Sequence, residues 1–252
     1  MNNTIRLLSS TALAVSLLVG AASFAFEAPA NIKAAVSNTA RPTADSDRDA
    51  NRKPAEVIAF AGIKAGDKVA DINPGGGYFT RIFSKVVGPS GKVLAVVGAT
   101  ALAAKPASGD AMRALQGDAG YGNIVLHPAD FDKLTTPEPL NVAWTSDNYH
   151  DFKNRDAGFT AAMNKAIFAA LKPGGTYIVI DHAAEKGSGG RDTNTLHRVD
   201  PELVKQEVLA AGFKLEAESS ILANPADNRT GKVFEGETRG KTDQFVLKFK
   251  KP

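Results

Sequence analysis

The densest group of reactive side chains in the sequence lies in residues 145–151, which read TSDNYHD. His150 could act there as a general base, because an imidazole titrates near neutral pH. Asp147 or Asp151 could orient its ring, and Tyr149 could form a wall of the site. An ordinary polar loop with a helix N-cap is the alternative. We interpret His150, Asp147 and Tyr149 as candidate catalytic residues.

All four histidines of the chain fall at or just beyond the ends of expected strands. They are His127, His150, His182 and His197. Imidazole and carboxylate groups at such ends could converge on a metal ion and support a metal-assisted hydrolase. No His-x-His or His-x-x-x-His spacing accompanies them, so we expect no metal site.

A second candidate site is the glycine run Gly75, Gly76 and Gly77, between an apolar stretch at 69–72 and a helix-like stretch at 78–87. Three glycines leave no β-carbon to keep a ligand away from the backbone. The helix that follows would point free N–H groups toward the same place. This arrangement predicts a nucleotide or nucleoside site, and a purely structural tight turn is the alternative.

Short apolar runs alternate with helix-like stretches through most of the chain. Strands are expected at 69–72, 92–97, 123–127, 141–145 and 176–180, and helices at 54–61, 78–87, about 108–117 and 156–171. This alternation predicts an α/β fold whose mostly parallel sheet is covered on both faces. Ligands of such sheets bind beyond the carboxyl ends of the strands, so both candidate sites belong to one edge.

The end of the chain has a different pattern. A helix at 201–211, capped by Asp200, is followed by a strand at 213–220. Residues 244–249 alternate as an edge strand does. The polar connection at 221–242 is long for a compact domain, and such a connection is more often a lid or a binding loop than filler.

A resemblance to a known family begins at residues 63–96, which read IKAGDKVADINPGGGYFTRIFSKVVGPSGKVLAV. This stretch resembles the first motif of class I S-adenosylmethionine-dependent methyltransferases, particularly the protein-isoaspartate type. Residues 171–182, LKPGGTYIVIDH, resemble the turn and fifth strand of the same superfamily. Positions 54–250 are similar to the exported predicted methyltransferases of proteobacteria. The resemblance implies a Rossmann-like methyltransferase fold, with a mostly parallel seven-stranded sheet and an antiparallel last strand.

The same resemblance implies roles for residues around S-adenosylmethionine. Asp71 would orient the amino acid part of this cofactor, and Gly75 and Gly77 would let the backbone approach it. Asn73 stands where the family usually has its first motif glycine. Asp130 falls where an acidic side chain meets the adenine amino group, and an ordinary turn residue is the alternative. The expected cofactor-binding residues are Asp71, Asn73, Gly75, Gly76, Gly77 and Asp130.

The second strand departs from the family at its end, because Gly98 stands where an acidic residue normally meets the ribose hydroxyls. The resemblance implies an S-adenosylmethionine-dependent methyltransferase that acts on a small molecule or a protein side chain. A non-catalytic nucleoside- or metabolite-binding protein on the same scaffold is the main alternative. Four residues before the first helix are expected to form a solvated charged face: Asp47, Arg48, Asn51 and Arg52. The alternative is that the two arginines reach the cofactor's carboxylate.

Residues 1–25 have the pattern of a cleaved secretory signal peptide. Arg6 precedes an apolar run at 7–19, and the small residues Ser23 and Ala25 suit a signal peptidase. An uncleaved anchor is the alternative. We therefore expect a periplasmic or secreted protein without a stable membrane span after cleavage.

The composition fits one folded domain behind this signal. The chain has 252 residues, no cysteine and a formal net charge of +3. Its Lys and Arg residues are scattered rather than clustered, so we expect no nucleic-acid partner. We divide the chain into the signal peptide at 1–25, a flexible leader at 26–51 and a methyltransferase-like domain at 52–252. The sequence leaves the oligomeric state open.

Overall fold

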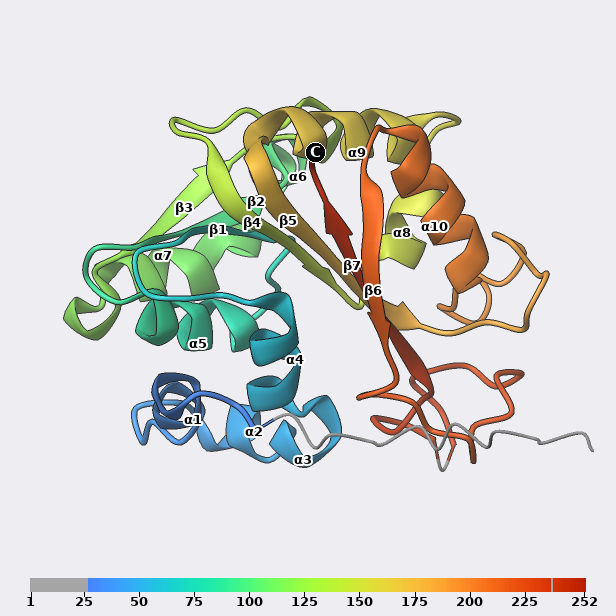
Figure 1. Ribbon diagram of the computed structural model, residues 1–252, viewed down its shortest axis with the longest axis horizontal. Helices are drawn as coiled ribbons and strands as arrows, with labels where there is room; N and C mark the ends of the chain where they lie inside the picture. Colours follow the sequence, from blue (N-terminus) through green and yellow to red (C-terminus); the bar gives the residue numbers. More distant parts are fainter. Residues whose placement is uncertain (1–26, 237) are drawn as a thin grey trace, which may run out of the picture.

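The computed structural model describes residues 27–236 and 238–252. The expected signal peptide lies outside these residues. None of the helices in the described part of the chain is long and apolar enough to cross a membrane. The described residues form the layers of an α/β protein, a central sheet with helices on both faces (Figure 1).

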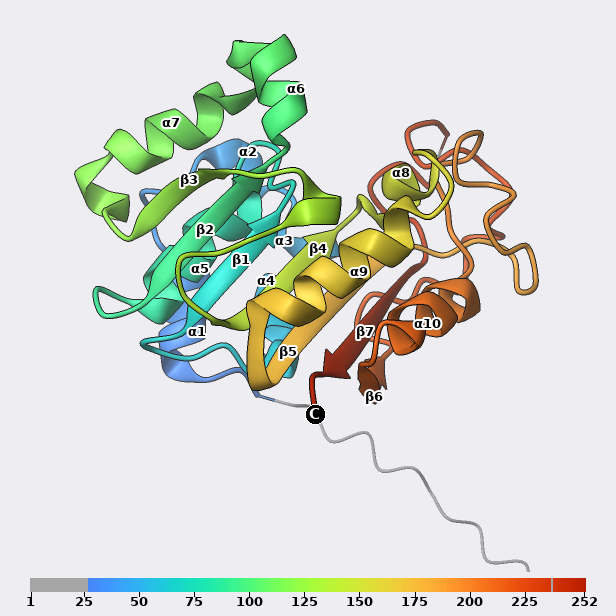
Figure 2. The same cartoon turned by 90° about the horizontal axis from the view of Figure 1, so that it is seen from above.

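Seven strands of the described residues form one sheet in the order β3-β2-β1-β4-β5-β7-β6 (Figure 2). The strands are β1 Lys68–Ile72, β2 Lys92–Val97, β3 Ile124–Pro128, β4 Leu140–Ser146, β5 Leu171–His182, β6 Lys214–Ser219 and β7 Gln244–Lys250. The paired strands among β1 to β5 are parallel, whereas β7 is antiparallel to both β5 and β6. The expected α/β fold class, with its antiparallel last strand, is confirmed.

The alternating pattern of the last strand suggested an edge position, but β7 lies inside the sheet. Strand β7 pairs with β5 on one side and β6 on the other, so β6 forms the edge. Every residue of β6 is exposed or half-buried, in keeping with an edge position. The alternation in β7 arises because its polar residues, such as Lys248 and Lys250, reach the partly open rim beside Glu216.

Helices cover both faces of the sheet (Figures 1 and 2). They are α1 Ala30–Val36, α2 Thr43–Ser46, α3 Asp49–Arg52, α4 Pro54–Ala61, α5 Tyr78–Val87, α6 Ala99–Ala104, α7 Asp110–Gly117, α8 Tyr149–Lys153, α9 Phe159–Ala170 and α10 Pro201–Ala210. Alternate strand residues point to opposite faces. Val69 and Trp144 share a core with α1, α4, α5 and α7, whereas Ala70 and Ala143 share the other core with α8, α9 and α10.

The prediction of a flexible leader at 26–51 was wrong for its described residues. This segment forms α1, α2 and most of α3, and Ile32 and Ala35 are buried against the core that contains α5. Arg41 is also buried, and its guanidinium donates to both carboxylate oxygens of Asp49, at 2.8 and 2.7 Å. The two buried residues of α1, Ile32 and Ala35, lie within one helical turn, too short a pattern to stand out in the sequence.

Candidate functional site

The glycine loop between β1 and α5 presents bare backbone at two of its three glycines. A β-carbon built on Gly75 or Gly76 would meet no atom within 4 Å. A β-carbon on Gly77 would lie 2.7 Å from side-chain atoms of Leu115 and Met112, which belong to α7. Gly75 and Gly76 therefore face open space, whereas Gly77 permits close packing of the loop against a helix.

A cavity of about 250 Å³ opens at this loop. Its wall includes Asp71 and Asn73 at the end of β1, Gly75 and Gly76 of the loop, and Asp147 just beyond β4. The structure thus brings four of the expected cofactor-binding residues together with one expected catalytic residue. The cavity lies at the carboxyl ends of neighbouring parallel strands, where ligands of such sheets bind.

A second cavity, of about 180 Å³, lies on the other side of the same loop. It is lined by the aromatic rings of Phe131 and Phe152 and by the backbone at Gly98. The two cavities share Asn73, Pro74, Gly75 and Asp151 in their walls. An elongated ligand could therefore lie across the glycine loop, with a polar end in the first cavity and an aromatic end in the second.

Two acceptor groups that form no ion pair among the described residues border the first cavity. Asp71 is 4% exposed and accepts a hydrogen bond from the Thr80 hydroxyl at 2.6 Å. Burial raises the pKa of Asp71 to about 6, although the Thr80 hydrogen bond opposes this effect. Asn148 donates through Nδ2 to the carbonyl of Ile72 at 3.0 Å, and its buried Oδ1 has no partner among the described residues. Both groups suit a cationic donor on a ligand.

Arginines from the N-terminal helices complete the opposite wall of this cavity. Arg48 and Arg52 line it, and each guanidinium carbon lies 4.8 Å from the centre of the Tyr78 ring. Arg48 also pairs with Asp45 at 2.9 Å, and Arg52 pairs with Asp147. The expectation of a merely solvated charged face is therefore corrected for these two arginines, because folding of the N-terminal segment carries them to the cavity.

The loop after β4 separates the candidate catalytic residues. Asp147 has φ of 57°, pairs with Arg52 and accepts a hydrogen bond from Gln244 at 2.6 Å. Tyr149 is fully buried in the core beside α9 and α10, and its hydroxyl donates to Glu207 at 2.9 Å. Tyr149 is not part of the wall of either cavity. Asp147 thus lines the candidate site, whereas Tyr149 packs in the core and stabilises the loop through its buried contacts.

His150 is buried between two carboxylates. Its Nδ1 lies 2.8 Å from Asp181 Oδ1, and its Nε2 lies 3.3 Å from Asp151 Oδ1. Burial alone would lower the pKa of His150, but Asp181 and Asp151 together raise it to about 10. A ring held as imidazolium cannot accept a proton, so this geometry does not favour the expected role of general base. The group that orients the ring most closely is Asp181 rather than Asp147.

Asp130 lines a neighbouring cavity of about 190 Å³, which shares Gly98, Ala101 and Phe131 with the second cavity at the glycine loop. Its carboxylate accepts hydrogen bonds from the backbone N–H and the hydroxyl of Thr100, each at 2.9 Å. Both bonds lower the pKa of Asp130. They place Asp130 at the first turn of α6, and its role toward adenine stays a prediction beside the alternative of a local turn residue.

Three of the four histidines come together beside the site. The ring centres of His150 and His182 are 6.0 Å apart, and those of His150 and His197 are 5.4 Å apart. His182 Nδ1 lies 2.7 Å from the hydroxyl of Thr242. His127 lies on the edge strand β3 and does not join them. Three of the four histidines that the sequence placed at strand ends therefore lie close together.

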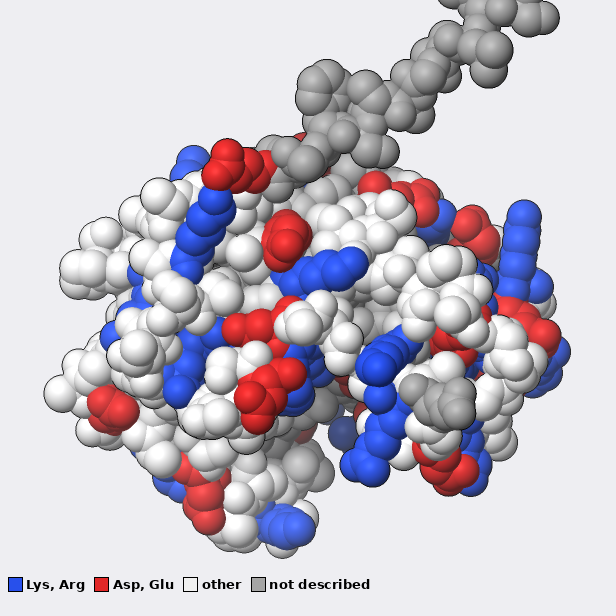
Figure 3. All heavy atoms as spheres, turned by 90° about the horizontal axis from the view of Figure 1, so that it is seen from below, with Lys and Arg blue, Asp and Glu red and all other residues white. Residues whose placement is uncertain are grey.

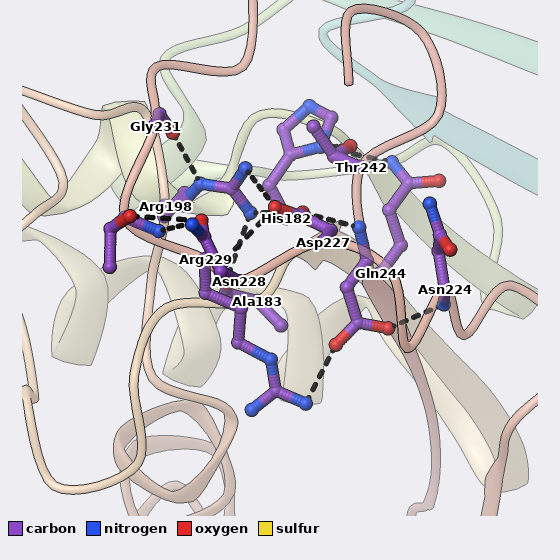
Figure 4. Close-up of polar contacts among 12 residues, drawn as sticks. His182, Ala183, Arg198, Asn224, Asp227, Asn228, Arg229, Gly231, Thr242 and Gln244 are labelled. Carbon is purple, nitrogen blue, oxygen red and sulfur yellow. Dashed lines mark hydrogen bonds and ion pairs between the residues drawn. The ribbon is translucent and has the colours of Figure 1, made fainter. Parts of the chain in front are cut away.

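The long connection at 221–242 is fastened by a buried arginine (Figure 4). Arg198 is fully buried and donates to Asp227 at 2.8 and 3.1 Å. It also donates to the carbonyls of Ala183 and Gly231, at 3.0 and 2.8 Å. None of the described residues of this connection lines either cavity at the glycine loop. Closure of the connection over a ligand stays a prediction.

Comparisons with known proteins agree with this geometry. The model of the protein-L-isoaspartate(D-aspartate) O-methyltransferase family matches residues 35–131. The ubiquinone/menaquinone biosynthesis C-methyltransferase UbiE of Pseudomonas paraeruginosa is 32% identical over 139 residues, which are 52% of this chain and 48% of that protein. UbiE of Stutzerimonas stutzeri is 32% identical over 132 residues, 50% of this chain and 45% of that protein. The chain thus spans about half the length of these curated relatives.

Solved structures share the fold at low sequence identity. A putative sarcosine dimethylglycine methyltransferase from Galdieria sulphuraria has a TM-score of 0.60 at 16% identity, over 82% of this chain and 87% of that chain. A SAM dependent methyltransferase from Aquifex aeolicus has a TM-score of 0.56 at 17% identity, over 78% and 88%. The family model covers the strand, glycine loop and helix that build the open backbone. The chain thus resembles methyltransferases over about half of its length and shares the fold of S-adenosylmethionine-dependent methyltransferases.

Several features of this site were not deduced from the sequence. Asn148 lay within the candidate loop, but its amide was not assigned a role. Asp181 was noted only as the residue before His182. The side chains of Arg48 and Arg52 could be placed at the cavity only once the N-terminal segment was known to fold back over it. The sequence could have indicated Asp181, because this residue lies beside His182 at the end of a strand, at the same edge of the sheet as the loop at 145–151.

Proposed function

We propose that this chain is an S-adenosylmethionine-dependent methyltransferase whose acceptor is a small molecule or a protein side chain. The observation that carries the proposal is the bare backbone at Gly75 and Gly76, which opens toward a polar cavity on one side and an aromatic cavity on the other. A ligand with an amino acid at one end and a nucleoside at the other has this division of chemistry.

The residues present fit the two ends of S-adenosylmethionine. Asp71 and the Oδ1 of Asn148 would accept hydrogen bonds from its ammonium group, and Arg48 would face its carboxylate. Phe131 and Phe152 would pack against its adenosine. When bound, the cofactor supplies an electrophilic methyl group on sulfonium.

The chain's own contribution to methyl transfer would be alignment rather than proton removal by His150. A direct displacement requires the acceptor atom and the methyl group to be held in line. Asp147 is fixed at the edge of the cavity by Arg52 and Gln244, where it can bind a donor group of an acceptor. His150 lies behind this loop as a buried, doubly paired group that holds the backbone of α8 in place.

We infer the class of acceptor from the polar side chains of the first cavity, because proteins with this fold differ in their substrates. They include a ubiquinone/menaquinone biosynthesis C-methyltransferase and a glycopeptide N-methyltransferase whose structure is complexed with sinefungin. The polar wall formed by Asp147 and the neighbouring arginines favours an acceptor that carries polar or charged groups. Lys and Arg side chains are interspersed with Asp and Glu over the face that carries the N-terminal helices (Figure 3), which does not favour a nucleic acid.

A non-catalytic binding protein on the same scaffold is the second candidate function. It is favoured by Gly98, which leaves the second cavity without the acidic residue at the end of β2 that would bind ribose hydroxyls. One solved structure with a TM-score of 0.57 and 17% identity is named a [4+2]-cyclase, SpnF, so the fold also carries other chemistry.

Calorimetry separates these two functions. The purified chain from Phe26 onward would be titrated with S-adenosylmethionine, S-adenosylhomocysteine and adenosine. Micromolar binding of the first two supports the methyltransferase, and incubation with labelled S-adenosylmethionine and candidate acceptors would then reveal the product by mass spectrometry. Binding of adenosine without either methionine derivative would favour the second function, and absence of any heat would reject both.

We also propose that the protein is exported to the periplasm or secreted. The proposal rests on Arg6, the apolar run at 7–19 and the small residues before Phe26. Cell fractionation followed by mass spectrometry of the N-terminus is the test. A mature chain that begins near Phe26 in the periplasmic fraction supports export, whereas a cytoplasmic chain that retains Met1 rejects it.

A further inference from the structure

Three side chains beside the two cavities offer metal-ligand atoms at one point. Ligand atoms of His150, Asp151 and His197 all lie within 4.8 Å of one another. We propose that these residues bind one divalent transition-metal ion. The proposal goes beyond methyl transfer and does not depend on it, because it concerns a separate set of side chains with its own ligand.

The distances between the ligand atoms are close to those of an occupied site. His150 Nε2 lies 3.3 Å from Asp151 Oδ1, and His197 Nδ1 lies 3.8 Å from the same oxygen. Ligand atoms around a tetrahedral zinc ion, at bond lengths of about 2.0–2.1 Å, are about 3.3 Å apart. A small rotation of the half-exposed His197 ring would therefore complete the set.

Asp181 fixes the orientation of the His150 ring. It accepts hydrogen bonds from the backbone N–H of His150 at 2.8 Å and of His182 at 2.7 Å. A carboxylate oxygen accepts hydrogen bonds, so His150 Nδ1 is the donor in their 2.8 Å contact. The Nε2 atom is then left facing Asp151, and a metal ion that binds there would displace the proton that Nε2 carries in the metal-free protein. A carboxylate behind the ring is the usual way in which proteins orient and strengthen a histidine ligand.

His197 is held in place by the buried arginine that follows it. Its φ of 57° is unfavourable for a residue with a β-carbon and persists only when the surroundings fix the backbone. Arg198 provides this anchor through its buried pair with Asp227 and its bond to the carbonyl of Gly231 (Figure 4). The ring of Phe234, 5.0 Å from that of His197, covers its outer side.

The local charge also suits a divalent cation. Asp151 and Asp181 both approach the His150 ring, and neither carboxylate pairs with a Lys or Arg among the described residues. The side chain of Asp151 is 53% exposed, so an ion has a path to the site from solvent. Two histidines and one carboxylate are a common set for zinc or iron, and they leave at least one position free. Because Asp151 lines both cavities, that position would border them.

Metal titration of the untagged, chelator-treated protein tests the proposal. Zn²⁺ would be followed by calorimetry and Co²⁺ by its visible absorption, which reports nitrogen and oxygen ligands directly. We expect one ion per chain. Asp151→Asn and His197→Ala should each weaken Zn²⁺ binding by about tenfold or more, the loss usual for a perturbed metal site. Neither residue is in the apolar core, so both variants should remain folded.

Matched controls come from the same chain. His127→Ala removes the histidine that lies outside the cluster, and Asp156→Asn removes an exposed carboxylate five residues from Asp151. Both should leave the Zn²⁺ affinity unchanged. The proposal is overturned if the native chain binds no ion, or if the two controls weaken binding as much as Asp151→Asn and His197→Ala. In either case the cluster is a polar network of histidines and carboxylates that does not bind a metal specifically.

Discussion

The two halves of the sheet's ligand-binding edge are built in different ways. Around β1 and β2 the site consists mainly of backbone, at Gly75 and Gly76, with Asp71 as its one buried carboxylate. Around β4 and β5 it consists of side chains that pair with one another, such as His150 with Asp181. The family model matches the first half, residues 35–131, and not the second.

This difference separates a shared function from an individual one. A bare loop before a helix can bind one kind of ligand in chains with different side chains, because the ligand meets backbone atoms. Paired side chains bind only what their particular arrangement permits. We therefore expect the first half to set cofactor affinity and the second half to set the acceptor, the metal and much of the local stability.

The largest expected effect is on the stability of the second half. Asp227→Ala would leave the fully buried Arg198 without its charged partner, and such a loss costs about 3–5 kcal/mol. Thermal unfolding should show a decrease in Tm of about 10 °C. Glu202→Ala, which removes the exposed partner of Lys205, is the control and should cost less than about 1 kcal/mol. Equal effects of the two variants would mean that the buried pair does not fasten the connection.

The next effect is confined to the first half. Gly76→Leu would place a side chain in the open space of the cavity without straining the backbone, since Gly76 does not have a positive φ. Affinity for S-adenosylmethionine should fall about 100-fold, which corresponds to about 2.8 kcal/mol, with little change in Tm. Gly117→Leu also fills open space, but in α7, and should leave affinity unchanged. Retained affinity in Gly76→Leu would place the cofactor elsewhere.

The sequence predicted the first half better than the second, for a physical reason. Gly75, Gly76 and Asp71 lie within six residues of one another, so strand, turn and helix signals were enough to place them. The partners of the second half are far apart in the chain. Asp181 and His150 are 31 residues apart, and their contact depends on which strands become neighbours. No local pattern contains that information.

The N-terminal segment illustrates the same limit. Its apolar residues are few, so the pattern alone suggested a flexible leader. Arg52 and Asp147, which pair across the cavity, are 95 residues apart. Tertiary contacts with α5 order this segment, and the burial of Ile32 shows that one helical turn was sufficient once a core was present to receive it.

A smaller effect in the first half is the pH dependence of stability and of S-adenosylmethionine affinity. Because burial raises the pKa of Asp71 from 3.8 to about 6, its ionised form opposes folding, and the free energy of unfolding should fall by about 2 kcal/mol between pH 4 and 7. Binding of an ammonium group has the opposite dependence, because it needs the carboxylate. Affinity for S-adenosylmethionine should weaken about tenfold from pH 7.5 to pH 5.

Asp71→Asn provides the matched control for this pH dependence. Calorimetry should give a lower affinity that no longer changes between pH 5 and 7.5, whereas the ligand-free variant should be more stable than the native chain at pH 7. If the variant keeps the native pH profile, another group binds the ammonium end of the ligand and Asp71 is only a buried structural residue.

The smallest expected effect tests whether the two halves act separately. Arg52 and Asp147 form an ion pair between them, and both side chains are about three-quarters or more buried. A double-mutant cycle with Arg52→Ala and Asp147→Asn isolates this pair from the stacking of Arg52 on Tyr78, because the stacking is lost equally in both arms that contain Arg52→Ala. Unfolding in urea should give a coupling of about 1 kcal/mol. A coupling that appears also in S-adenosylmethionine affinity would mean that the acceptor half helps to hold the cofactor. A coupling in stability alone would mean that the pair joins two independent sites.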